Sequence, residues 1–383
     1  AKAKPIVAEV VSVFGKVVLI LLKIIAGFIV FGLIMAACAL IIGMFALIVG
    51  GLLLLALGYS PLKAYGTIID GSLGSKTFVR QTIKIAIPLL GCALAIAPCF
   101  KMRFWNIGAE GQITAGAIAA SYFALYWVGK VPSAVLLLIM GLAGAVAGGI
   151  WALIPAFFKA KWNTNETLFT LMMNYIIIGV VRWLQGGPWE GRPGSQIIPQ
   201  FDRAATLPKV LGVHCGWIIV LILVVFMHVY MNHTKHGYEI TVVGESERTA
   251  RYVGIKVDKV IIRTMALSGA ICGLAGLLLV GGSSHSIDSN LVDGRGFTAI
   301  MVSWLAKFDP FTMILTTLLL VFLARGADEV TSKFGLNSDF SEILTGIILF
   351  FIIGCEFFIN YQVHFNHHKK EKTASAVQSG EGN

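Results

Sequence analysis

Residues 103–112, RFWNIGAEGQ, place two amides and a carboxylate among apolar residues in an apolar part of the chain. The side chains of Asn106, Glu110 and Gln112 could bind a polar solute through hydrogen bonds. An unpaired carboxylate in lipid is unfavourable by several kcal/mol, so Glu110 must face protein, water or a cation such as Arg103. Two hypotheses stay open: the segment is a broken helix that lines a solute path, or it is a helix start that Asn106 caps.

A second polar segment, residues 163–176, NTNETLFTLMMNYI, leads into an apolar run. Asn165 is a suitable N-cap residue and Glu166 suits the positive end of a helix dipole, so capping alone could account for both. Asn174 lies deeper in the run, where its amide needs a partner. It could line a route for a polar solute, or it could hold two helices together.

Aromatic side chains accompany these polar groups and could stack on a flat base, or could equally be packing residues. They are Trp105, Tyr175 and Trp304. The hypothetical substrate path therefore combines both kinds of residue: Trp105, Asn106, Glu110, Gln112, Asn165, Glu166, Asn174, Tyr175 and Trp304.

A third polar segment, residues 236–263, holds nine Asp, Glu, Lys or Arg among its 28 residues, although only 13% of the chain is charged. Ser246 can cap a helix of about two turns, which Gly254 ends as a left-handed cap. Glu247 and Arg251 have the spacing of a helical ion pair. Since so short a helix is unstable alone, composition favours a solvated loop, and a helix packed on a partner is the alternative.

Several functions find no support in the sequence. It contains no GxxxxGK[ST] phosphate loop, no HExxH, no GxSxG and no EF-hand loop, so we expect neither an enzyme nor direct ATP binding. The six cysteines lack metal-ligand spacing, and a solvated basic flank explains His364, His367 and His368 better than a metal site. We therefore predict no metal and no cofactor.

Composition indicates a membrane protein. The chain is 57% hydrophobic with a mean hydropathy of +0.82, and residues 24–62 contain no Asp, Glu, Lys or Arg. Because a spanning backbone must satisfy its own hydrogen bonds, we predict an all-α polytopic membrane protein. The net charge of +10 fits cytoplasmic loops rather than nucleic acid, since no basic domain with interleaved aromatics is present.

Apolar runs predict about ten transmembrane helices: 26–58, 82–100, 104–128, 132–158, 166–186, 214–232, 262–282, 296–308, 309–327 and 340–361. The eighth is too short to cross alone and is expected to be a half-helix or a re-entrant segment. With ten spans, both termini lie on the same side of the membrane. The connections on that side, which include the N-terminus, residues 234–263 and the C-terminal tail, hold 18 of the 30 Lys and Arg residues, and this excess favours the cytoplasmic side for both termini. If residues 24–62 form two helices rather than one, the N-terminus moves to the other side.

The predicted organisation has three parts. Residues 1–25 form a basic, amphipathic segment, residues 26–361 form the transmembrane domain, and residues 362–383 form a disordered cytoplasmic tail. Within the domain, residues 234–261 make a cytoplasmic loop and residues 187–213 a sizeable external loop. The external loop could dock a delivery protein or could simply cap the helices.

Several motifs in order resemble one family: SPLKAY at 60–65, NIGAEGQ at 106–112, NETLFTLMMNYI at 165–176, GESERTARYVGIKV at 244–257, SGAICGLAGL at 268–277 and GRGFTAIMVSWLAKFDP at 294–310. From about residue 59 to 361 the chain is similar to permeases of ABC importers of the branched-chain amino acid and sugar type. It resembles most the nucleoside or simple-sugar branch, which works with basic membrane lipoproteins.

The resemblance implies a plasma-membrane permease subunit that takes up nucleosides. It also implies a second related permease, an ATPase with two nucleotide-binding domains in one chain, and an extracellular lipoprotein that delivers the small-molecule substrate. The cytoplasmic loop would then carry the coupling helix, which contacts the ATPase through Gly244, Glu245, Ser246, Glu247, Arg248, Ala250, Arg251, Tyr252 and Gly254. Ala250 and Val253 are expected on one face of this helix, with Tyr252 beside them.

Other functions remain open. The same branch suggests riboflavin, simple sugars or other purine-like compounds as rival substrates. An ion-coupled secondary transporter is the rival from another class, with Glu110, Glu166, Glu342 and Glu356 as relays. A structural or sensory membrane subunit without transport is a weaker alternative.

Overall fold

A computed structural model describes residues 48–52, 54–56, 58–337, 339–347, 350 and 354. The chain divides into two units, residues 1–59 with 346–383, and residues 60–345. In the first unit, residues 48–52 and 54–56 are helical. The predicted N-terminal segment, most of the first predicted span, the C-terminal tail and Glu356 lie outside the described residues. All that follows concerns the second unit.

Six helices of the described residues are long and apolar enough to cross a membrane. They are α3 (Lys76–Lys101), α5 (Ser133–Trp162), α6 (Glu166–Gln185), α7 (Gly216–His233), α10 (Val257–Leu279), which continues into the π-helical turn η2 (Val280–Ser284), and α12 (Pro310–Phe334). The all-α polytopic fold is therefore confirmed. The count of about ten spans and the side of the termini stay predictions.

Three further helices belong to the helical body: α2 (Pro61–Leu73), α4 (Ala109–Tyr126) and α11 (Arg295–Leu305). With 11 residues, α11 rises about 16 Å, roughly half the thickness of a hydrocarbon core. The expectation of a short helix near residues 296–308 is confirmed. Helix α2 lies between the first two predicted spans and was not predicted as a separate helix.

Glycines set the closest helix packing, between α4, α5 and α10. A Cβ atom at Gly116 or Gly148 would overlap the α10 backbone at Gly273 or Gly269. A Cβ atom at Gly273 would overlap the Gly144 carbonyl of α5 in turn. Small residues at such crossings let helix backbones approach closely, which favours association in lipid. This three-helix core supports the polar residues described below.

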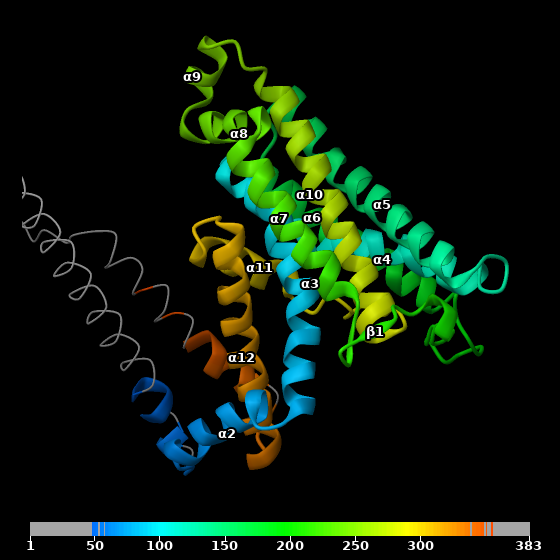
Figure 1. The fold of residues 1–383 in the computed structure, drawn as a ribbon, viewed down its shortest axis with the longest axis vertical. Helices are drawn as coiled ribbons and strands as arrows, with labels where there is room; N and C mark the ends of the chain where they lie inside the picture. The colour runs from blue at the N-terminus through cyan, green and yellow to red at the C-terminus, as the bar shows by residue number, and fades with distance from the viewer. Residues whose placement is uncertain are drawn as a thin grey trace, which may run out of the picture. The chain divides into compact units, whose positions relative to one another are not determined.

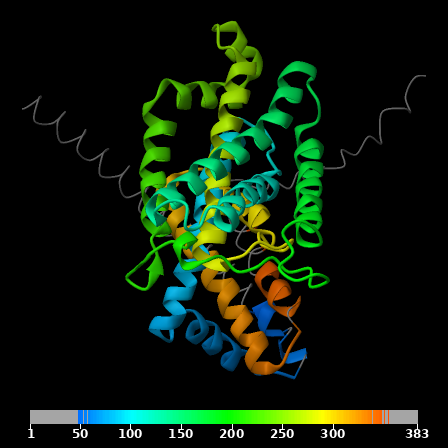
Figure 2. The same ribbon diagram turned by 90° about the vertical axis from the view of Figure 1, so that its right-hand side faces the viewer.

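The two ends of the helical body differ (Figure 1). At one end, α8 (Lys235–Glu245) and α9 (Glu247–Tyr252) connect α7 to α10. At the opposite end of α7, β1 (Lys209–Val210) and β2 (Val213–His214) form an antiparallel hairpin, in which Lys209 pairs with His214 and Val210 with Val213. Figure 2 shows the same separation of α8 and α9 from the hairpin.

The long connection at the hairpin end, residues 187–213, is folded against the helices and includes the 3-10 turn η1 (Arg203–Ala205). The N–H groups of Phe201 and Leu207 donate to the carbonyls of His285 and Gly281, both at 2.8 Å. The side chains of Ile198, Phe201 and Leu207 are buried. The connection therefore covers the end of α10 as a packed cap.

Candidate functional site

Residues 101–112 join α3 to α4, and we call them the hub segment because they contact four other elements. The chain turns sharply at Arg103, whose φ is 60°, and the Phe104 N–H donates to the Cys99 carbonyl at 2.9 Å. Helix α4 then begins at Ala109 with Gly108 as its N-cap. The segment is a break between two helices, as the broken-helix hypothesis expected, and Glu110 lies in the first turn of α4, as the helix-start hypothesis expected. That the segment lines a solute path stays a prediction.

Asn106 organises the interior of the hub segment and is fully buried. Its Oδ1 accepts from the Gly108 N–H at 3.1 Å and from Gln112 Nε2 at 3.0 Å. Its Nδ2 donates to Ser268 Oγ of α10 at 3.4 Å. The N-cap of α4 is Gly108, so the prediction that Asn106 is the N-cap residue is wrong. Asn106 instead stabilises the turn before α4 and connects this turn to α10 by a hydrogen bond.

Glu110 is 7% exposed and binds the start of α11 with both oxygens. Oε1 accepts from the Gly294 N–H at 2.9 Å, and Oε2 accepts from the Gly296 N–H at 3.0 Å. The first N–H groups of a helix have no partner within the helix, so a carboxylate there satisfies them and the helix dipole together. The partners of Glu110 are therefore backbone N–H groups at the N-terminus of α11. In the part of the chain that the structure describes, Glu110 forms no ion pair with Arg103, the cation suggested from the sequence.

Asn174 connects α6 to the hub segment and is 3% exposed. Its Nδ2 donates to the Ile107 carbonyl at 2.9 Å, and its Oδ1 accepts from the Gly111 N–H at 2.9 Å. One turn earlier, Thr170 Oγ1 accepts from the Ile107 N–H at 3.2 Å. Of the two hypotheses for Asn174, this geometry favours the one in which it holds two elements together.

Asn165 and Glu166 act locally at the start of α6. Asn165 Oδ1 accepts from the Leu168 N–H at 3.2 Å, which is the predicted N-cap. Glu166 Oε2 lies 2.8 Å from Lys159 Nζ at the end of α5. Both residues therefore have structural partners that fix the α5–α6 turn.

A pair of tryptophans lies beside the polar groups of the hub segment. Trp105 and Trp304 of α11 stack with ring centroids 6.1 Å apart and planes 29° apart, and Phe100 meets both edge-on. The two indoles remain 48% and 46% exposed. Tyr175 is also exposed, but it makes no ring contact with either tryptophan in the described part of the chain. The paired indoles thus form an accessible aromatic surface.

The segment α8–α9 has the predicted short helix. Ser246 Oγ accepts from the Thr249 N–H at 3.2 Å, Glu247 lies 4.0 Å from Arg251, and Gly254 has a φ of 85°. The expected face needs correction, because Ala250 is fully buried against this chain while Tyr252 is 92% exposed. The helix is therefore held by its own chain, and its outward surface consists of other residues: Glu247, Arg248, Thr249, Arg251, Tyr252 and Val253.

The α8–α9 segment touches the hub segment directly. A Cβ atom at Gly244, at the end of α8, would overlap the Lys101 carbonyl oxygen. Arg263 of α10 also pairs with Glu239 of α8 at 2.8 Å, which fixes α8 on the body. Only three residues lie between Lys101 and Trp105. The end of α8 therefore lies directly against the segment that carries the first tryptophan.

Residues 78–353, more than two thirds of the chain, match the family described as branched-chain amino acid transport system / permease component. The chain belongs to this permease family. It is therefore a multi-pass membrane protein and a transport component rather than a catalyst. The hub segment, α6 and α11 all lie inside the matched range.

Three relatives of the permease show what its family members transport. The glucose ABC transporter permease TsgB13 of Haloferax volcanii is 33% identical over 88% of this chain and 91% of its own length. The guanosine ABC transporter permease NupP of Bacillus subtilis is 30% identical over 82% and 91%. The nucleoside ABC transporter permease NupB of Lactococcus lactis is 27% identical over 80% and 88%.

The structure of the permease groups the sequence-predicted residues into three places. The first place is the hub segment, which contains Asn106, Glu110 and Gln112 and is contacted by Asn174. The second is the tryptophan pair beside it, Trp105 and Trp304. The third is the α5–α6 turn, which holds Asn165 and Glu166. Sequence reasoning missed the partner residues of the hub: Lys101, Thr170, Ser268, Gly294 and Gly296. Thr170, Ser268, Gly294 and Gly296 belong to family-like motifs, although nothing in those motifs indicated their partners, and Lys101 had no distinguishing pattern.

Proposed function

We propose that this chain is the permease subunit of an ATP-driven importer that takes up nucleosides. The observation that carries the proposal is the stacked, half-exposed pair Trp105 and Trp304 beside the polar hub. A planar base stacks favourably on an indole face, by about 1–3 kcal/mol per base in nucleic-acid complexes. The guanosine and nucleoside permeases among the relatives support the same substrate class.

Energy is proposed to enter through α9. Its exposed surface, which includes Tyr252 at the end of the helix, suits a groove on a separate ATPase, as amphipathic helices commonly dock in grooves. Buried Ala250 and Gly244 act on the inner side, where Gly244 abuts Lys101. ATP-driven closure of the ATPase would move α8 and α9, and the hub segment would transmit this motion to α4, α6, α10 and α11.

The remaining partners follow from the same proposal. A second related permease subunit completes the path, and an extracellular lipoprotein delivers the solute. The packed cap formed by residues 187–213 offers the delivery protein exposed apolar side chains at Ile197 and Leu211. In this arrangement α8 and α9 lie on the cytoplasmic side and the hairpin lies outside.

Glucose is the second candidate substrate, because the relative TsgB13 carries that name and sugars also stack on tryptophan. The two are separated by measuring uptake of radiolabelled guanosine and glucose in cells that express the complete importer, with a strain lacking this gene as the control. Gene-dependent guanosine uptake that excess uridine reduces and excess glucose leaves unchanged supports the proposal. Gene-dependent uptake of glucose alone contradicts it.

The alternative of an ion-coupled transporter has less support than the ABC importer, because two of the carboxylates suggested as ion relays already have partners. Glu110 has both oxygens bound to backbone N–H groups, and Glu166 is paired with Lys159, so neither is free to relay protons. The distinguishing measurement is uptake in vesicles. Transport that needs ATP and survives a protonophore supports the ABC importer, whereas transport that continues without ATP and stops with the protonophore supports the secondary transporter.

A further inference from the structure

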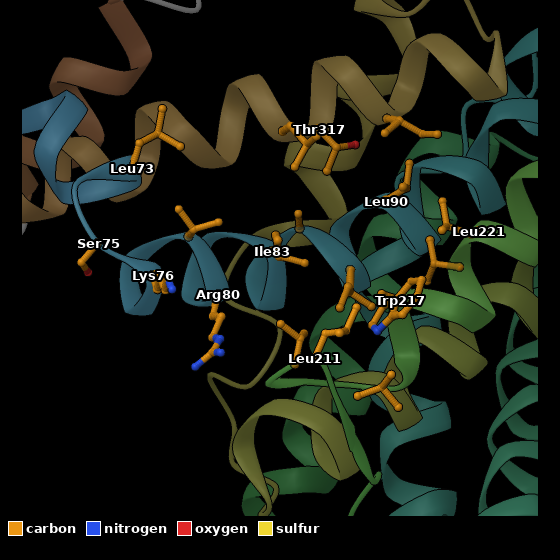
Figure 3. Close-up of a pocket in the computed structure, with 18 of the residues that line it drawn as sticks. Leu73, Ser75, Lys76, Arg80, Ile83, Leu90, Leu211, Trp217, Leu221 and Thr317 are labelled. Atoms are coloured by element: carbon orange, nitrogen blue, oxygen red, sulfur yellow. The ribbon is translucent and has the colours of Figure 1, made fainter.

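An apolar groove of about 710 Å³ runs along α3 at the hairpin end of the protein (Figure 3). Its walls come from α3, α7 and α12, and the end of α2 and the hairpin close it at one side. Ile83 and Leu90 of α3, Trp217 and Leu221 of α7, and Leu211 of the hairpin give its lining an aliphatic and aromatic character. Such a volume is typical of ligand sites, which measure about 300–1,000 Å³.

The two charged side chains of the groove lie together at one end of it. Lys76 and Arg80 are four residues apart in the first two turns of α3, so they share a helix face. Both are exposed, and no carboxylate lies within ion-pair distance of either one in the part of the chain that the structure describes. The lining contains no Asp or Glu. The open end of the groove is therefore positively charged without internal compensation.

The position of Arg80 depends on the hairpin turn. Gly212 has a φ of 85°, and a Cβ atom there would come 2.5 Å from Arg80 Nε. The guanidinium therefore lies across a glycine that leaves room for it. Since α3 is a candidate membrane span that begins at Lys76, its first two turns belong at a membrane boundary, where phosphate head groups are found.

We propose that this groove binds an anionic phospholipid, with its phosphate between Lys76 and Arg80 and an acyl chain along the apolar wall. The charge distribution matches such a lipid, because both cations lie at the boundary end of the groove and, apart from Ser75 and Thr317, the other side chains that line it are apolar. A protein partner such as the second permease subunit would need carboxylates opposite the two cations. The bound lipid would hold α3, α7 and α12 together on the face away from α8.

The test uses the purified full-length permease in a neutral detergent, with phosphatidylglycerol or phosphatidylcholine added and bound lipids counted by native mass spectrometry. The wild-type protein is expected to retain one phosphatidylglycerol in preference to phosphatidylcholine. The double variant Lys76→Gln/Arg80→Gln should bind phosphatidylglycerol about 30-fold more weakly, since each neutralised cation near an anionic surface weakens binding about fivefold. Lys130→Gln, an exposed cation in the α4–α5 turn, is the matched control and should leave binding unchanged.

A second variant tests the apolar wall without changing charge. Leu221→Trp adds bulk to the groove at a half-exposed position and should lower retention of phosphatidylglycerol, with the elution volume of the protein unchanged. The proposal is overturned if the wild-type protein retains phosphatidylglycerol and phosphatidylcholine equally. It is also overturned if the Lys76→Gln/Arg80→Gln variant retains as much phosphatidylglycerol as the wild-type protein does. The proposal is also overturned if inorganic phosphate alone raises the melting temperature of the protein as much as phosphatidylglycerol does. It is likewise overturned if, in the complete importer, a cysteine introduced by Leu221→Cys cross-links to the second permease subunit, because the groove would then hold that subunit in place of lipid.

Discussion

The side-chain amide of Asn174 donates to the carbonyl of Ile107 at 2.9 Å, and this bond joins the middle of α6 to the break between α3 and α4. The same amide accepts from the Gly111 N–H on the far side of the break. One buried side chain thus bridges the last residues of the irregular segment and the first turn of α4. The irregular segment can persist in the membrane because protein groups satisfy it.

Asn174→Leu is expected to destabilise the permease and to reduce uptake in proportion. The Ile107 carbonyl and the Gly111 N–H would both lose their partner, at about 1–3 kcal/mol for each buried group left unpaired. The measurement is melting temperature in detergent beside uptake per folded molecule. Tyr175→Leu, at the exposed neighbouring position, should keep the melting temperature. Uptake lost at full stability would instead make Asn174 a path residue.

Trp105→Ala and Trp304→Ala should each raise the KM for guanosine uptake at least about fivefold, since stacking on an aromatic ring contributes about 1–3 kcal/mol per base. Phe at either position should restore most of the affinity, because it keeps a ring face. Trp183→Ala removes a tryptophan of α6 that is more exposed than either of the pair, and serves as the control. Unchanged KM values in both alanine variants would assign the pair to packing.

Tyr252→Asp and Glu247→Arg should leave the permease folded but separate ATP hydrolysis from uptake. Tyr252 is 92% exposed, so its replacement disturbs no internal packing, and Asp introduces charge on the surface proposed to meet the ATPase. The measurements are co-purification of the ATPase and uptake per ATP hydrolysed. Lys130→Glu, which reverses a charge at an exposed position in the α4–α5 turn, is the control for charge alone. Normal association together with normal transport in both α9 variants would rule out this contact.

Gly244→Ala should reduce coupling without preventing ATPase binding, because the added methyl group meets the Lys101 carbonyl and pushes α8 away from the hub segment. Uptake per ATP hydrolysed is expected to fall several-fold. Gly179→Ala is the matched control, since its Cβ atom would have open space and alanine is favoured over glycine in a helix. If both variants behave like the wild-type protein, the contact does not transmit motion.

His214 makes stability depend on pH. Burial, with the nearby charge of Lys84, lowers the pKa of His214 from 6.5 to about 4. The unfolded chain therefore binds this proton first, so stability is constant above pH 6.5 and decreases as pH falls from 6.5 towards 4. Melting temperature measured across this window should decline by a few degrees in the wild-type protein. His214→Gln should flatten the profile, and an unchanged slope would assign it to another group.

Local chemistry made some features predictable from the sequence. Long uncharged runs indicated membrane helices, since an apolar stretch of sufficient length has few other stable environments. The caps at Asn165 and Ser246 were also predictable, because each cap satisfies N–H groups only a few residues away. The ordered motifs indicated the permease family, which the family match confirmed.

Partners far apart in the chain were decided only by the tertiary structure. Glu110 binds N–H groups 184 and 186 residues later, and no spacing rule could choose them over Arg103, seven residues away. Likewise, only packing could show that Ala250 faces inward and that Gly244 touches Lys101. The physical reason is that one sequence determines where polar groups need partners, while the packing of helices from distant segments determines which partners they reach.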